Sequence, residues 1–174
     1  RFYDVFSRCI MINSVKNFLK KYLLIFRVWD KFSPAAQAAQ RQLFLYYQER
    51  AASGNPPALK DTGLKVFSQH EEDGLLLFIF SVIGMGQKRF VEIGSNDGVN
   101  SNCANLILNF GWYGLFIDGD KTALARGRRF YQRYPDPWAY HPQFICHKVT
   151  RENVNQLIGE AGLLGEIDLL SIDL

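Results

Sequence analysis

The amino-acid sequence predicts an α/β fold, in which a doubly wound parallel sheet follows an α-helical N-terminal extension. Three observations lead to this prediction. Strand-like and helix-like segments alternate from about residue 90 onward, the strand-like segments are apolar on both faces, and a glycine-bearing turn follows the first of them. Strands that are apolar on both faces are typical of parallel sheets covered by helices. The alternating order favours right-handed crossovers between neighbouring strands.

Composition is typical of a folded domain with an extension. The chain has 174 residues, of which 48% are hydrophobic and 14% aromatic, and this excludes a disordered protein. A formal net charge of +3 is too small to indicate a nucleic-acid partner, so none is expected. Three scattered cysteines, Cys9, Cys103 and Cys146, indicate neither a disulfide framework nor a zinc site. We therefore expect no metal site and a reducing, cytoplasmic location.

The first 31 residues carry seven Lys or Arg and two acidic residues. Apolar residues recur at helical spacing between these basic residues, namely Ile12, Val15, Phe18, Leu19, Tyr22, Leu23 and Phe26. This pattern predicts a basic amphipathic helix that packs on the rest of the protein. The alternative is peripheral membrane contact through its basic and apolar faces. The apolar run is far shorter than the ~20 residues of a membrane span, and no secretory cleavage site follows it.

A second helix is predicted before the alternating region. The Ser-Pro pair at 33–34 is a typical helix start, and the following run up to Ala52 is rich in Ala, Gln and Leu. Asn-Pro-Pro at 55–57 then interrupts the chain. We therefore predict a helical extension over 1–57 and a ligand-binding domain over 58–174.

A third helix is predicted immediately before the sheet. Ser68 and Glu71 have the spacing of a capping box. The run from Leu75 to Ile83 is almost wholly apolar and is followed by Gly84, so we expect a buried helix. His70 lies beside three acidic residues at this helix start, where a solvated surface position is favoured over a ligand position.

The alternating region is predicted to contain four strands and three helices. The strands are expected over 90–93, 114–118, 143–147 and 167–174, and the helices over 101–110, 121–131 and 151–161. The last strand would be an apolar edge without a neighbour, which is an aggregation hazard. We therefore expect the chain to be poorly soluble or inactive by itself. Because it begins with Arg1 and stops directly after a strand-like run, we also expect that it is cut at both ends and truncated after the fourth strand.

The turn after the first strand is the main candidate for ligand binding. Its sequence from Glu92 to Gly98 is Glu-Ile-Gly-Ser-Asn-Asp-Gly. Such a turn brings backbone N–H groups and a helix N-terminus toward a bound nucleotide-type cofactor. Acidic residues also follow other strands, Asp118 with Asp120 after the second and Asp173 after the fourth. Because the carboxyl ends of parallel strands meet at one edge of the sheet, these acids predict a binding site there.

A dinucleotide is disfavoured by the residues of this turn. The fingerprint Gly-x-Gly-x-x-Gly, counted from Gly94, needs glycine at the positions of Asn96 and Val99. The second glycine lets the backbone approach a pyrophosphate, and an asparagine side chain obstructs that approach. The acidic Glu92 is also unfavourable beside a diphosphate.

The pattern acid-x-Gly-x-x-x-Gly from Glu92 to Gly98, followed after twenty residues by Asp118, resembles motif I of class I S-adenosylmethionine-dependent methyltransferases. Asn96 and the segment Ile-Asp-Leu-Leu-Ser-Ile-Asp at 167–173 are similar to the FkbM-type branch in particular. The resemblance covers about residues 64–174. It implies a Rossmann-like fold with seven strands, of which this chain supplies four.

The resemblance implies a set of cofactor-binding residues for S-adenosyl-L-methionine. The candidates are Glu92, Gly94, Ser95, Asn96, Asp97, Gly98, Asp118, Gly119, Asp120, His147 and Lys148. Within this set the turn would lie under the methionine part, with Glu92 beneath it to orient it. Asp118 would accept hydrogen bonds from the ribose hydroxyls, and His147 and Lys148 lie where the family contacts adenine.

The resemblance further implies a methyltransferase that acts on an oxygen atom of a small molecule or glycan. Asp173 matches the fourth-strand acid that faces the methyl group and the substrate. It is the catalytic candidate, either as the base that a hydroxyl acceptor needs or as a positioning group. Two alternatives stay open. One is a binding module with this fold but without catalysis, and the other is an enzyme that binds NAD or a nucleotide sugar.

Overall fold

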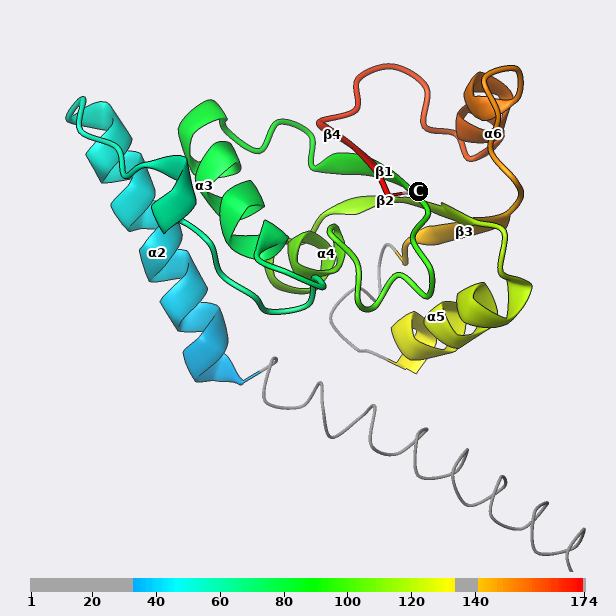
Figure 1. Ribbon diagram of the computed structural model, residues 1–174, viewed down its shortest axis with the longest axis horizontal. Helices are drawn as coiled ribbons and strands as arrows, with labels where there is room; N and C mark the ends of the chain where they lie inside the picture. The colour runs from blue at the N-terminus through cyan, green and yellow to red at the C-terminus, as the bar shows by residue number, and fades with distance from the viewer. Residues whose placement is uncertain (1–32, 134–140, 174) are drawn as a thin grey trace, which may run out of the picture. The chain divides into compact units, whose positions relative to one another are not determined.

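The structure is a computed structural model that describes residues 33–133 and 141–173 (Figure 1). The chain forms two compact units, Arg1–Gln40 and Arg41–Leu174. The basic amphipathic helix predicted within the first 31 residues lies outside the described residues. In the first unit, helix α2 (Pro34–Ala52) begins as predicted, because the backbone N–H of Ala36 donates to Oγ of Ser33 over 3.2 Å.

The second half of α2 belongs to the larger unit. Tyr47 is buried and meets Phe78 edge-to-face, with 5.3 Å between the ring centroids. Phe44 lies beside Phe110 at 6.1 Å. Both aromatic contacts lie within the larger unit, and the domain boundary at the Asn-Pro-Pro break at 55–57 stays a prediction.

Four parallel strands form a single sheet in the described part of the chain. They are β1 (Arg89–Ile93), β2 (Tyr113–Asp118), β3 (Gln143–Cys146) and β4 (Leu169–Ile172), in the order β3-β2-β1-β4. The α/β class and the parallel sheet are therefore confirmed. Because β1 is central, the turn that follows it is flanked by the ends of β2 and β4.

Helices cover both faces of this sheet. On one face, Leu157 of α6 (Val154–Glu160) packs in a cluster with Val91, Ile93, Leu115 and Ile117. On the other face, the rings of Phe90, Phe116 and Phe144 lie about 5 Å apart in succession, and Tyr131 of α5 (Lys121–Arg133) packs against them. Figure 1 shows α5 and α6 on opposite sides of the strands.

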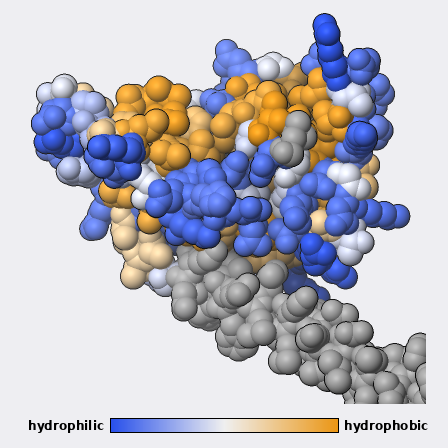
Figure 2. Space-filling view, in the orientation of Figure 1, coloured by the Kyte–Doolittle hydropathy of each residue, from blue (hydrophilic) through white to orange (hydrophobic). Residues whose placement is uncertain are grey.

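Helix α3 (Glu72–Ile83) is only half buried. Leu77 and Phe80 are buried, and Phe80 packs on Trp112, whereas Ile79, Val82 and Ile83 are exposed. The prediction of a buried helix is therefore wrong for one of its faces. Figure 2 shows hydrophobic residues gathered over α3 and over the neighbouring end of the sheet.

The start of α3 also differs from the prediction. The capping box between Ser68 and Glu71 does not form. Oγ of Ser68 instead accepts the backbone N–H of Asp73 over 3.3 Å and donates to the carboxylate of Asp73 over 3.0 Å, and the side chain of the N-cap residue, Glu71, makes no cap hydrogen bond. One oxygen of Asp73, Oδ2, also accepts the backbone N–H groups of Val66, Phe67 and Ser68 over 2.7, 2.6 and 2.9 Å. Asp73 thus fixes the loop that leads into α3.

Strand β4 is an edge of the sheet, as predicted, and it is apolar. Leu170 and Ile172 are 53% and 59% exposed. They lie in register with Val91 and Ile93, on the face of the sheet where α6 packs. The cluster around α6 includes residues of β1 and β2 but not Leu170 or Ile172. The expected poor solubility stays a prediction.

Within residues 33–133 and 141–173, no helix has both the length and the apolar character that crossing a membrane requires.

Candidate functional site

The turn after β1 holds three residues with positive φ. These are Gly94 at 79°, Asn96 at 52° and Gly98 at 67°. At Gly94 an added Cβ would lie 1.6 Å from the carbonyl oxygen of Asp173. The N–H of Asp173 in turn donates to the carbonyl of Ile93 over 2.9 Å. Glycine at position 94 therefore lets the ends of β1 and β4 meet, which brings Asp173 to the turn.

Helix α5 supports the turn from the other side. The hydroxyl of Tyr131 donates to the carbonyl oxygen of Gly98 over 2.7 Å. At Gly127 an added Cβ would lie 2.0 Å from the carbonyl oxygen of Asp97. Oδ1 of Asp97 accepts the N–H groups of Val99 and Asn100 over 3.0 and 3.3 Å. The Asp97 side chain, predicted to bind cofactor, is thus used inside the turn.

Glu92 is 1% exposed and binds the segment that enters α4 (Ala104–Phe110). Its two carboxylate oxygens accept the backbone N–H groups of Asn102 and Cys103 over 3.1 and 2.9 Å. The resemblance implied that Glu92 orients the glycine turn, whereas these hydrogen bonds go to the start of the helix. Burial raises the pKa of Glu92 above its ordinary value of 4.5, although hydrogen bonds from Cys103 and Asn102 oppose this shift.

The free energy of unfolding is expected to fall as the pH rises above about 4.5, because the folded protein holds the Glu92 proton more tightly than the unfolded chain does. This stabilisation is fully present below the unfolded pKa and is lost as the pH rises through the folded pKa. Glu92→Gln should lose this part of the pH dependence. It should retain the part due to Asp73, because burial also raises the pKa of Asp73. Urea denaturation between about pH 4 and pH 8 measures both slopes. If the free energy of unfolding changed equally with pH in the wild type and in Glu92→Gln, Glu92 would not be the source of this pH dependence.

Asp118 joins the end of β2 to the turn. Its Oδ2 accepts the N–H of Asn96 and its Oδ1 accepts the N–H of Asp120, both over 2.7 Å. Each oxygen of an ionised carboxylate has a second lone pair, so Asp118 can still accept hydrogen bonds from ligand hydroxyls. Oδ1 of Asp120 instead accepts the N–H groups of Thr122 and Ala123, which lowers the pKa of Asp120 and begins α5.

The remaining cofactor candidates lie at the same edge of the sheet. The N–H of His147 donates to the carbonyl of Asp118 over 3.1 Å, which places the end of β3 beside the end of β2. His147, Lys148 and Gly119 are exposed. Nothing lies within 4 Å of a Cβ added to Gly119, so there is open space above the end of β2.

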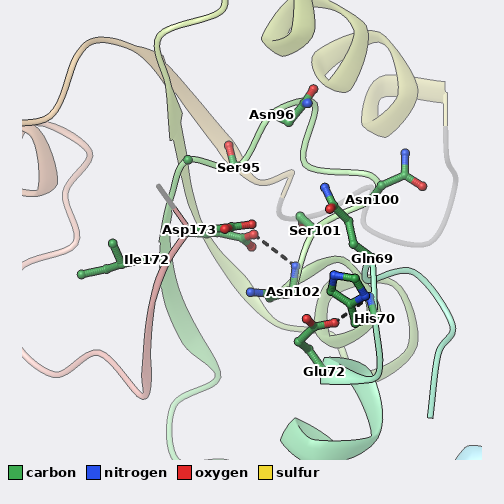
Figure 3. A pocket seen from close by; sticks show the side chains of 12 residues that line it. Gln69, His70, Glu72, Ser95, Asn96, Asn100, Ser101, Asn102, Ile172 and Asp173 are labelled. Atoms are coloured by element: carbon green, nitrogen blue, oxygen red, sulfur yellow. Dashed lines mark hydrogen bonds between the residues drawn. The ribbon is translucent and has the colours of Figure 1, made fainter. Parts of the chain in front are cut away.

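A pocket of about 150 Å³ opens between the turn, the start of α4, the end of β4 and the loop before α3 (Figure 3). Five predicted site residues line it: Glu92, Gly94, Ser95, Asn96 and Asp173. The other lining residues were not predicted, and they are Gln69, His70, Glu72, Asn100, Ser101, Asn102 and Ile172. The structure therefore brings the first and fourth strand ends together in the pocket, and Asp118 and His147 are not among its lining residues.

The pocket is acidic. Its described lining contains three carboxylates, Glu72, Glu92 and Asp173, and no Lys or Arg. Oγ of Ser95 is buried, and it has no hydrogen-bond partner among the described residues. A lining of this kind suits a ligand with cationic groups and hydroxyls, and it is unfavourable for phosphate.

Comparisons with models of protein families, with curated proteins and with solved structures found no match for this chain.

Proposed function

We propose that this chain is part of an S-adenosyl-L-methionine-dependent methyltransferase of the FkbM-like branch, built on a doubly wound Rossmann-like domain. The observation that carries the proposal is the acidic pocket at the ends of β1 and β4, with three carboxylates and without Lys or Arg in its described lining. The sulfonium and ammonium groups of S-adenosylmethionine are both cationic, whereas a dinucleotide would bring a diphosphate beside those carboxylates.

The positions of the other candidates support the same ligand. The turn with Gly94, Ser95 and Asn96 lines the pocket and would hold the methionine part. Asp118, joined to this turn through Asn96, would accept hydrogen bonds from the ribose hydroxyls. His147 and Lys148, exposed at the end of the adjacent strand, would lie along the adenine.

The proposed reaction is the methylation of a hydroxyl group on a small molecule or glycan. The cofactor supplies an activated methyl group, so the protein chiefly has to position donor and acceptor in line. Asp173, exposed and held at the turn by its backbone, would act there as a base or as a positioning group. The proposal includes a cytoplasmic location, because the thiols of Cys103 and Cys146 are both free.

Isothermal titration of the full-length protein with S-adenosylmethionine and with NAD tests this proposal. We expect binding of the first ligand and none of the second. Asp118→Ala should weaken S-adenosylmethionine binding by roughly tenfold to a hundredfold, since charge-assisted hydrogen bonds contribute about 1.5–3 kcal/mol each.

Asp61→Ala removes an exposed acid outside the pocket and is the matched control for Asp118→Ala. It should leave the affinity for S-adenosylmethionine unchanged. Unchanged affinity in Asp118→Ala would refute the assignment of that acid, and tighter binding of NAD than of S-adenosylmethionine would overturn the proposed function.

A further inference from the structure

Helix α5 has a strongly basic outer face. It packs against one face of the sheet through its apolar residues (Figure 1). Among its 13 residues there is no acidic one. The helix contains five basic residues, all of them exposed, and they are Lys121, Arg126, Arg128, Arg129 and Arg133. One side of α5 therefore belongs to the core, and the other presents positive charge to the solvent.

Three of these arginines form a row along the helix. Arg126, Arg129 and Arg133 follow one another at spacings of three and four residues, which places their side chains on one face. Arg128 is used differently, because its Nη2 donates to the carbonyl oxygen of Phe144 and so ties α5 to β3. The row has no such printed bond to the sheet, and its guanidinium groups are available to a partner.

The stability of the helix does not account for this row. Like charges three and four residues apart repel one another, and α5 has no acidic residue between them. The helix dipole favours Arg133 in the last turn, but it disfavours Lys121 at the first position. Asp120 attracts Arg126 from before the helix, and it is one acid against several bases. We therefore looked for an anionic partner of this face.

The uncharged residues of the same face indicate which kind of polyanion fits. Single-stranded nucleic acids are held by aromatic rings on which the bases stack. The aromatic residues of α5 are Phe130, which is only partly exposed, and Tyr131, which is buried. Thr122 and Ala125, which are exposed between the basic residues, are too small to anchor a base. The face thus offers charge without a stacking platform, and this suits an extended anionic surface such as a bilayer with acidic lipids.

We propose that the outer face of α5 docks the protein onto an anionic membrane surface, with Arg126, Arg129 and Arg133 against the lipid headgroups. The contact is peripheral, because the apolar side of α5 is buried against the sheet and does not enter the lipid. It holds whether or not the chain binds S-adenosylmethionine, so it is independent of the proposed function. Being electrostatic, it should weaken when the salt concentration rises from about 0.1 M to about 0.5 M.

Co-sedimentation of the full-length protein with lipid vesicles tests the proposal. Vesicles of phosphatidylcholine with about one third phosphatidylserine should bind the protein, and vesicles of phosphatidylcholine alone should not. Replacing the three arginines of the row together, as Arg126→Gln, Arg129→Gln and Arg133→Gln, should weaken binding by roughly a hundredfold. Each basic residue near an acidic lipid surface contributes about fivefold. Glutamine forms helices about as well as arginine, so we expect this variant to fold.

Two control variants separate the row from net charge and from side-chain packing. Arg41→Gln, Lys60→Gln and Arg151→Gln together remove the same charge from exposed residues outside α5, and should change binding by less than about threefold. Replacing the three arginines of the row by lysine keeps their charge and should retain binding within about threefold. Arg129→Glu places an acid between Arg126 and Arg133, which favours the helix, and should still weaken vesicle binding by roughly tenfold or more.

Four results would overturn the inference. They are a wild type that binds neither kind of vesicle, equal losses in the control outside α5 and in the glutamine variant of the row, and equal losses in its lysine and glutamine variants. The fourth is tighter binding of a single-stranded RNA than of the acidic vesicles, which would assign the face to nucleic acid instead.

Discussion

Replacing Gly94 with alanine is expected to destabilise the α/β unit by about 2–5 kcal/mol and to abolish binding of S-adenosylmethionine. The left-handed backbone at φ 79° costs a residue with a side chain about 1–2 kcal/mol. Overpacking adds about 1–3 kcal/mol, because the new Cβ would lie 1.6 Å from the carbonyl oxygen of Asp173. Neither partner in this contact is a flexible side chain, so the ends of β1 and β4 have to separate. Urea denaturation and titration calorimetry measure the two effects.

Gly111→Ala is the matched control for Gly94→Ala. Gly111 has a similar φ of 68°, and nothing lies within 4 Å of an added Cβ. Its replacement should therefore lower the free energy of unfolding only by the about 1–2 kcal/mol that a side chain costs in a left-handed backbone conformation. Equal destabilisation of the two variants would show that the contact between Gly94 and Asp173 does not constrain the fold.

The Asp73→Ala variant should lose about 3–5 kcal/mol of stability. Oδ2 of Asp73 accepts three backbone N–H groups from residues 66–68, and each donor left without a partner in a buried region costs about 1–3 kcal/mol. The loop that carries His70 and Glu72 into the pocket would lose its support as well. Urea denaturation measures the change in the free energy of unfolding.

Asp61→Ala again serves as the control, because surface substitutions of this kind usually change stability by less than about 0.5 kcal/mol. Asp73→Asn, which keeps one accepting oxygen, should be intermediate between Asp73→Ala and the wild type. A loss below about 1 kcal/mol in Asp73→Ala would mean that water replaces the carboxylate at these donors.

The sequence pattern predicted the sheet well because the signals for strands are local. Runs that are apolar on both faces gave each strand to within a few residues, and the glycine turn followed the first strand as expected. Helix starts were less accurate. Helix α4 begins at Ala104 and was expected at 101, because a carboxylate ten residues away, that of Glu92, binds the N–H groups just before it. Pairing of this kind depends on tertiary structure and has no local pattern.

Five of the twelve described lining residues could be predicted, and they belong to the end of β1, to the turn after it or to the position after β4. The residues from the loop before α3, Gln69, His70 and Glu72, could not be predicted. Acidic residues at a helix start are already expected from the helix dipole, so their presence there gave no sign of a binding site. The capping box failed for a related reason. Ser68 has the spacing to accept the backbone N–H of Glu71, but its hydroxyl donates to the buried Asp73 carboxylate and its oxygen accepts the N–H of Asp73 instead.

The support that α5 gives to the glycine turn has a consequence for the order of folding. The hydrogen bond from Tyr131 to Gly98 spans 33 residues, and closing a loop of that length costs chain entropy before any contact compensates it. A nascent chain that has emerged only as far as β2 therefore lacks the contact that completes the turn, and we expect it to bind the proposed cofactor only after α5 has docked.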